Sequence, residues 1–127
     1  MTADGLFSLA IGLAGGGEED REDYGEQFLP VLNVLLAETF DVNNSIRVYR
    51  SKEELTEIPE VTALTDELTY EPEVLRKVLP YGIAGTLYQE DSASIAMQYM
   101  NKYEVARMGA GKAQHVEITD YYSEDEE

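Results

Sequence analysis

The chain has 127 residues, with 26 acidic and 9 basic side chains, a formal net charge of −17 and no cysteine. This length suits one domain that buries roughly two thirds of its unfolded surface, and an apolar content of 43% argues against disorder. The charge disfavours binding to nucleic-acid backbones and anionic membranes. The lack of cysteine removes disulfides, thiolate nucleophiles and the usual structural zinc sites.

The first forty residues predict two helices. Residues 3–14 carry apolar side chains at helical spacing and end at three glycines, 15–17, so we expect a short core helix there and no secretory signal, since no Lys or Arg precedes the apolar stretch. A second helix of about twenty residues begins with the carboxylates after Gly17, which favour a helix N-terminus. Pro30 should kink or divide it. No segment approaches the roughly eighteen apolar residues of a membrane span.

Residues 41–69 lack a helical pattern and are predicted to form a long connecting loop. The alternation from Ile46 to Arg50 is consistent with one short strand. Because long loops in compact domains are commonly functional, the segment is a candidate contact loop, with a solvated linker as the alternative.

Two further helices and a tail complete the prediction. Pro72 suits the first turn of a third helix, which Pro80 should kink or break. Asp91 and Ser92 offer N-cap oxygens for a fourth helix that ends at Gly109. The fold expected is therefore all-α, a small bundle of about four main helices within residues 1–111. Residues 112–127 form an extended acidic tail that either frays or adds a strand to a partner's sheet.

The side-chain inventory points away from catalysis. His115 is the single histidine, so a catalytic triad, a Cys–His pair and a histidine-rich metal cluster are excluded. The carboxylates are interpreted as solvated helix faces, because none stands in a polar spot within an apolar stripe. The segment from Asp41 resembles a calcium loop but has Ile46 at the glycine position and Lys52 at the glutamate position. The segment 106–113 is likewise rejected as a phosphate loop, because it has alanine at the first glycine position and at the Ser/Thr position. No catalytic residue, metal site or cofactor is predicted.

Nine tyrosines are a large number for this length. Tyr24, Tyr99 and Tyr103 fall on predicted inner faces and are expected in the core. The tyrosines predicted in loops or tail are interface candidates, since Tyr combines a large contact area with a polar end. They are Tyr49, Tyr70, Tyr121 and Tyr122.

Residues 58–104 carry a recognisable order of short motifs. Ile58-Pro59 opens the segment, Leu79-Pro80-Tyr81-Gly82-Ile83-Ala84 and Leu87-Tyr88 follow, and Ala96-x-x-Tyr99-x-Asn101-x-Tyr103-Glu104 closes it. This order resembles the adaptor, or head-completion, proteins of tailed-phage and prophage head–tail connectors. In that family the motifs form a helical hairpin at the heart of the fold. The hairpin residues expected here are Leu79, Ile83, Leu87, Ile95, Tyr99 and Tyr103.

The resemblance implies a structural subunit of a homo-oligomeric ring, usually twelvefold. The ring lies beneath the portal protein and above a stopper or tail-completion protein, and DNA passes through its centre. Such a subunit is part of the virion at the head–tail junction and assembles in the host cytoplasm. An acidic channel wall would repel phosphate and let the genome slide, without sequence-specific binding.

The family pattern also suggests which segments make contacts. One end of an adaptor grips the portal, which we carry onto Val116, Ile118, Tyr121 and Tyr122 in the tail. An extended segment reaches a neighbouring subunit or the stopper, which we carry onto Arg47, Tyr49 and Arg50.

Three alternatives remain at this point. An acidic DNA mimic that inhibits a DNA-binding protein fits the charge, although the acids cluster at 18–26 and in the tail instead of running evenly. A magnesium enzyme using several carboxylates is a weaker alternative. An acidic helical domain with another role is the third.

Overall fold

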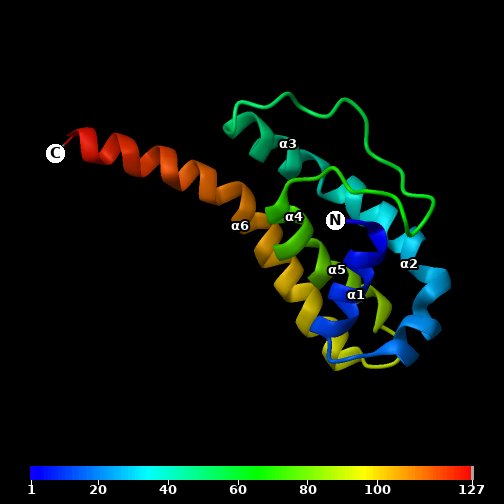
Figure 1. The fold of residues 1–127 in the computed structure, drawn as a ribbon. Coiled ribbons are helices and arrows are strands. Elements are labelled where there is room, and N and C mark those ends of the chain that lie inside the picture. The colour runs from blue at the N-terminus through cyan, green and yellow to red at the C-terminus, as the bar shows by residue number, and fades with distance from the viewer. Residues whose placement is uncertain (127) are drawn as a thin grey trace.

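The computed structural model describes the backbone of residues 1–126 and the side chains of residues 1–110. The predicted all-α bundle is confirmed, and the helices of this part of the chain run in the order shown in Figure 1. They are α1 (Ala3–Leu13), α2 (Glu18–Glu38), α3 (Phe40–Tyr49), α4 (Pro72–Lys77), α5 (Leu79–Leu87) and α6 (Ala93–Glu126).

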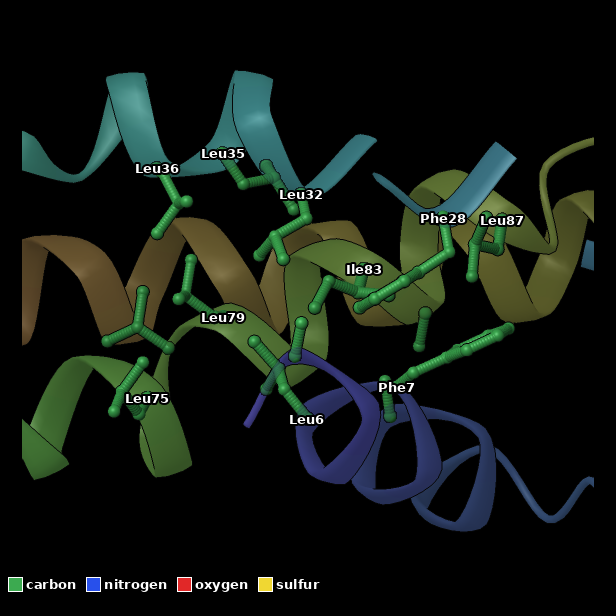
Figure 2. Close-up of a cluster of buried hydrophobic side chains, with 14 of the residues drawn as sticks. Leu6, Phe7, Phe28, Leu32, Leu35, Leu36, Leu75, Leu79, Ile83 and Leu87 are labelled. Atoms are coloured by element: carbon green, nitrogen blue, oxygen red, sulfur yellow. The ribbon is translucent and has the colours of Figure 1, made fainter. Parts of the chain in front are cut away.

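Helix α5 lies at the centre of the bundle. It runs between α1 and α2, and α6 covers a third side (Figure 2). Seven of its nine residues are buried, as expected for a helix that is apolar on nearly every face. Ile83 lies between side chains from α1 and α2, where Phe7 and Phe28 stack with ring centroids 4.2 Å apart.

Two glycines let α6 approach α5 closely. A Cβ atom on Gly82 would lie 2.8 Å from the ring of Tyr103, and one on Gly85 would lie 2.9 Å from the backbone nitrogen of Met100. Neither distance is tolerable, so the spacing of the two helices depends on the missing side chains. This spacing allows Tyr103 to be fully buried.

The prolines and the first glycine run affect the helices in different ways. Helix α1 ends before Gly15, whose φ of +82° is the left-handed conformation that glycine adopts readily. The predicted interruption near Pro80 is confirmed, since α4 and α5 are separate helices that meet at Val78. Helix α2 instead runs undivided through Pro30. Pro30 and Glu26, whose carbonyl loses its helical partner, are both exposed, so water can satisfy that carbonyl.

The strand expected at residues 46–50 and the loop start at residue 41 were wrong. Residues 41–49 belong to helix α3, and the loop is confined to 50–71. Asn43 and Asn44 are buried in α3, where they bond to backbone groups 28 and 11 residues further along the chain. Hydrogen bonds to distant partners leave no periodic signal in the sequence, so the two asparagines favoured the prediction of a loop.

The predicted stop at Gly109 and the extended conformation predicted for residues 112–126 were also wrong. Helix α6 has 34 residues and continues to Glu126. The chain has no proline after Pro80, and a glycine inside a helix costs only about 1 kcal/mol, so Gly109 and Gly111 weaken the helix without ending it. The side chains of the tail lie outside the described residues.

The loop 50–71 is held along its length by the rest of the chain. Asn44 exchanges hydrogen bonds with the backbone of Leu55 at 2.8 and 3.1 Å, and Asn33 does the same with Val61 at 2.8 and 2.9 Å. Further on, the backbone N–H of Leu68 donates to the carbonyl of Met1 at 2.9 Å. Beside it, Thr2 forms an isolated β-bridge with Glu67. The loop is therefore exposed over most of its length but anchored at several points.

We predict that Gly85→Ala destabilises the fold by about 1–3 kcal/mol, because the new methyl group meets the backbone of Met100. The matched control is Gly25→Ala in α2, where a Cβ atom meets nothing within 4 Å. That change should stabilise the protein by up to about 1 kcal/mol, since glycine is the poorer helix former. Urea unfolding followed by circular dichroism measures both. Equal effects of the two substitutions would contradict the close packing of α5 and α6.

Candidate functional site

The expected hairpin residues lie on α5 and α6 and belong to the same hydrophobic core. Leu79, Ile83, Leu87 and Tyr103 are buried, and Ile95 and Tyr99 are partly buried against the same core. Tyr103 also donates a hydrogen bond from its hydroxyl to Glu38 at 2.7 Å. Burial of the ring and then this carboxylate raise the pKa of Tyr103, so the hydroxyl stays protonated and remains a donor. The hairpin is thus tied to the end of α2.

The expected loop contacts lie at the C-terminal end of α3. Tyr49 is 48% exposed, in keeping with an interface candidate. Arg47 and Arg50 instead turn toward Glu71, at the start of α4. Tyr70, which we expected at an interface, is buried, and its hydroxyl donates to the carbonyl of Leu36.

Glu71 is the centre of a cluster that the sequence did not reveal. Glu71 is only 3% exposed. Its carboxylate lies 3.1 Å from Arg50 Nη1, 3.0 Å from Lys52 Nζ and 3.6 Å from Arg47 Nη1. Its backbone N–H donates to Asn43 Oδ1 at 2.7 Å. The expectation that every carboxylate is a solvated surface group is therefore wrong for Glu71. A signal was present, since three of the nine basic residues fall within positions 47–52.

The electrostatics of the Glu71 cluster favour the ionised carboxylate. Burial opposes ionisation, but hydrogen bonds from Lys52 and Arg50 outweigh it and hold the pKa of Glu71 below its usual range. Arg50 also bonds Glu73, and this bond lowers the pKa of that carboxyl. The cluster fastens both ends of the 50–71 loop, and it leaves Arg47 and Arg50 committed to partners inside the chain.

Tyrosine–carboxylate bonds fasten the other end of the bundle. Tyr24 donates to Asp91, and Tyr88 donates to Asp20 at 2.6 Å. The two rings meet edge to face with centroids 5.0 Å apart. These bonds hold the first turn of α2 against the turn between α5 and α6. Tyr24 is buried, in line with its expected place in the core.

One surface combines aromatic rings with a cation that makes no ion pair within the described part of the chain. Tyr81 and Tyr99 stack with centroids 6.2 Å apart, and Lys102 Nζ lies 5.9 Å and 5.2 Å from the two centroids. Tyr99 donates to the carbonyl of Leu13 at 2.9 Å, which joins this surface to the end of α1. Val105, beside Lys102 on α6, is 72% exposed. A partly exposed aromatic pair beside an exposed apolar side chain is typical of contact surfaces.

The expected portal contacts lie in the last part of α6. Val116, Ile118, Tyr121 and Tyr122 belong to this helix by their backbone, and their side chains lie outside the described residues.

The described residues contain no candidate metal site and no membrane span, and no match to the chain was found. Among the described residues, no group of three or more His, Asp or Glu side chains is placed to hold a metal ion, and no helix is long and apolar enough to cross a membrane. No protein-family model, curated protein or solved structure matches the chain.

We predict that Glu71→Gln lowers the free energy of unfolding by about 1–3 kcal/mol near neutral pH, because the bonds to three cations lose the charge that strengthens them. The pKa of Glu71 is depressed in the folded state, so its contribution is present above the ordinary glutamate pKa of about 4.3 and is lost as the pH falls through the folded value. Urea unfolding of both proteins as a function of pH measures this. Their difference should be constant near neutrality and shrink on acidification.

The control for this prediction is Glu54→Gln, an exposed position on the same loop. It should change the free energy of unfolding by less than about 0.5 kcal/mol. A difference between wild type and Glu71→Gln that grows in acid would contradict the assignment.

Proposed function

We propose that this protein is a non-catalytic subunit of a phage head–tail connector ring, placed between the portal and a stopper or tail-completion protein. The observation that carries the proposal is the motif order of residues 58–104. Its two most distinctive parts are the segments that build α5 and the first turns of α6. Gly82 and Tyr103, one from each part, are in close contact. The motifs therefore belong to one packing unit, as in the family that they resemble.

The course of α6 supports a linking role. A helix of 34 residues is about 50 Å long, and Figure 1 shows it leaving the bundle toward the C-terminal end. The other helices have 21 residues or fewer, and the C-terminal part of the α6 backbone extends beyond them in Figure 1. A helix that projects from a folded body can dock on a larger partner. In the proposed ring this partner is the portal.

The charge supports a role beside a moving DNA molecule. Acidic side chains on the channel side of a ring would repel the phosphates and prevent the genome from adhering. A protein of this kind would occupy the head–tail junction of the virion after assembly in the bacterial cytoplasm.

The second candidate is an acidic DNA mimic. The first turns of α2 favour it, because Glu18, Glu19, Glu22, Asp23 and Glu26 are all exposed within nine residues. A mimic would bind a basic DNA-binding protein in competition with DNA, and this binding would fall steeply with salt. A connector subunit would bind portal rings, and DNA would not displace it.

We predict that deletion of residues 113–127 leaves a folded protein that no longer joins portal-containing heads to tails. The core residues that the structure describes precede this segment, so circular dichroism and thermal unfolding should still show a cooperative helical domain. The measurement is an in vitro assay in which heads lacking this protein are incubated with it and with tails, and joined particles are counted by electron microscopy. Normal joining by the truncated protein would refute the assignment of the tail to the portal.

A matched control separates the tail from general weakening. The Glu71→Gln variant changes a residue at the end of the 50–71 loop, outside the deleted tail. It should retain head joining at temperatures where it is folded. Loss of joining in both variants would indicate a stability effect, and loss in the truncated protein alone would support the tail contact.

A further inference from the structure

The few cations of the chain are distributed unevenly. Most of the described Lys and Arg side chains are used in ion pairs within the chain: Arg21, Arg47, Arg50, Lys52 and Arg107. Arg76, Lys77 and Lys102 are exposed and make no ion pair among the described residues. In a chain with a net charge of −17, exposed cations that are not neutralised internally mark a surface suited to an acidic partner.

Arg76 and Lys102 lie at the two ends of a row of neighbouring residues, here called the basic–aromatic face. Arg76 adjoins Leu9 of α1, and Leu13 lies one helical turn further along α1. The carbonyl of Leu13 accepts the hydroxyl of Tyr99, whose ring stacks on Tyr81 beneath Lys102. The members of the face are Leu9, Leu13, Arg76, Tyr81, Tyr99, Lys102 and Val105. It offers apolar contact area bordered by two cations, which is the composition of a protein-binding surface.

A complementary surface occurs on α2. Glu19, Glu22, Asp23 and Glu26 fall on one side of the helix and are all exposed, and they are here called the acidic edge. The opposite side of α2 carries Tyr24 and Phe28, which are buried. The acidic edge therefore points away from the bundle.

The two surfaces lie on different sides of the molecule. Phe28 and Leu32 of α2 point toward α5 in Figure 2, so the acidic edge faces outward beyond α2. On α6, Met100 and Tyr103 lie on the side that contacts α2, where Met100 shares a groove with Val34 and Tyr103 bonds Glu38. Lys102 lies on the side that contacts Tyr81. One subunit can therefore use both surfaces at once.

We propose that the basic–aromatic face of one copy binds the acidic edge of α2 in the next copy. Two different surfaces that complement each other on one chain produce a head-to-tail contact, and such contacts close into rings when the rotation permits. The inference deepens the proposed connector function, because it assigns the surfaces through which neighbouring subunits of the ring would meet. The opposed charges also give such copies a preferred orientation, despite the repulsion expected between molecules of the same net charge.

The absence of cysteine makes a direct test possible. One cysteine replaces Asp23 on the acidic edge and another replaces Val105 on the basic–aromatic face. A flexible bis-maleimide reagent, which spans separations too long for a disulfide, is added to the concentrated double variant Asp23→Cys/Val105→Cys. A head-to-tail contact should give a ladder of covalent trimers and higher multimers on a denaturing gel. Each single variant should remain monomeric.

The matched control pairs Val105→Cys with Val34→Cys. Val34 is 59% exposed on α2 but lies outside the acidic edge, so this pair should give no ladder. Equal ladders from the test pair and the control pair, or no ladder from the test pair, would overturn the proposal. Dimers from a single variant would overturn it too, because they show contact between identical surfaces. A ladder from Val105→Cys with Ser123→Cys, but not with Asp23→Cys, would assign the face to a neighbour's tail instead.

A charge exchange tests the electrostatic part within the double-cysteine protein. Changing Arg76 and Lys102 to Glu should reduce ladder formation about tenfold, and changing Glu19 and Glu22 to Lys should do the same. Combining both sets restores opposite charges across the contact and should recover the ladder. Failure of the combined variant to recover, while circular dichroism shows a folded protein, would contradict the pairing.

These experiments are independent of the portal. A ladder without head joining would leave the subunit contact in place and remove the connector function. Head joining without a ladder would support the connector function and remove the proposed contact between subunits.

Discussion

The close approach of α5 and α6 is the constraint on which the other contacts depend. Gly82 and Gly85 leave room for the ring of Tyr103 and the backbone of Met100, so α6 lies against α5 at a distance that larger residues would forbid. At that distance the hydroxyl of Tyr103 reaches Glu38, the last residue of α2. Helix α3 begins two residues later, at Phe40. The position of α3, and with it the start of the long loop, therefore follows from the packing of the hairpin.

Polar contacts hold the loop 50–71, which lies largely outside the apolar core. The loop 50–71 has few buried side chains, yet Asn33, Asn44 and the cations around Glu71 bind its backbone or its end. Each of these bonds contributes modestly, and together they give the loop one conformation. A loop that is ordered before binding loses less conformational entropy when a partner docks on it. Its exposed residues, including Ile58, are thus held in place.

The sequence predicted the parts of the fold that rest on apolar periodicity and local stop signals. The existence of α1, α2 and α5, the break near Pro80 and the start of α6 follow from such signals, which act within one or two turns. Helix α3 was missed because its buried asparagines are satisfied by Leu55 and Glu71 across the loop. The end of α6 was missed because a glycine lowers helix propensity without forbidding a helix. Among the candidate contact residues, Arg47 and Arg50 looked available only because their carboxylate partners at 71 and 73 are distant in sequence.

The distribution of charge links the fold to the proposed assembly. Five cations are used to hold the chain together, so the acids that remain on the surface are largely uncompensated, and copies of the protein should repel one another in dilute solution. Association then requires a surface where the remaining cations meet acids of a neighbour, and the basic–aromatic face is placed to provide it. Because the repulsion acts at longer range than the contact, a preformed platform that raises the local concentration would favour the ring over free oligomers. In the proposed connector, the portal supplies that platform, and the unpaired acids that remain on the inner wall face the DNA.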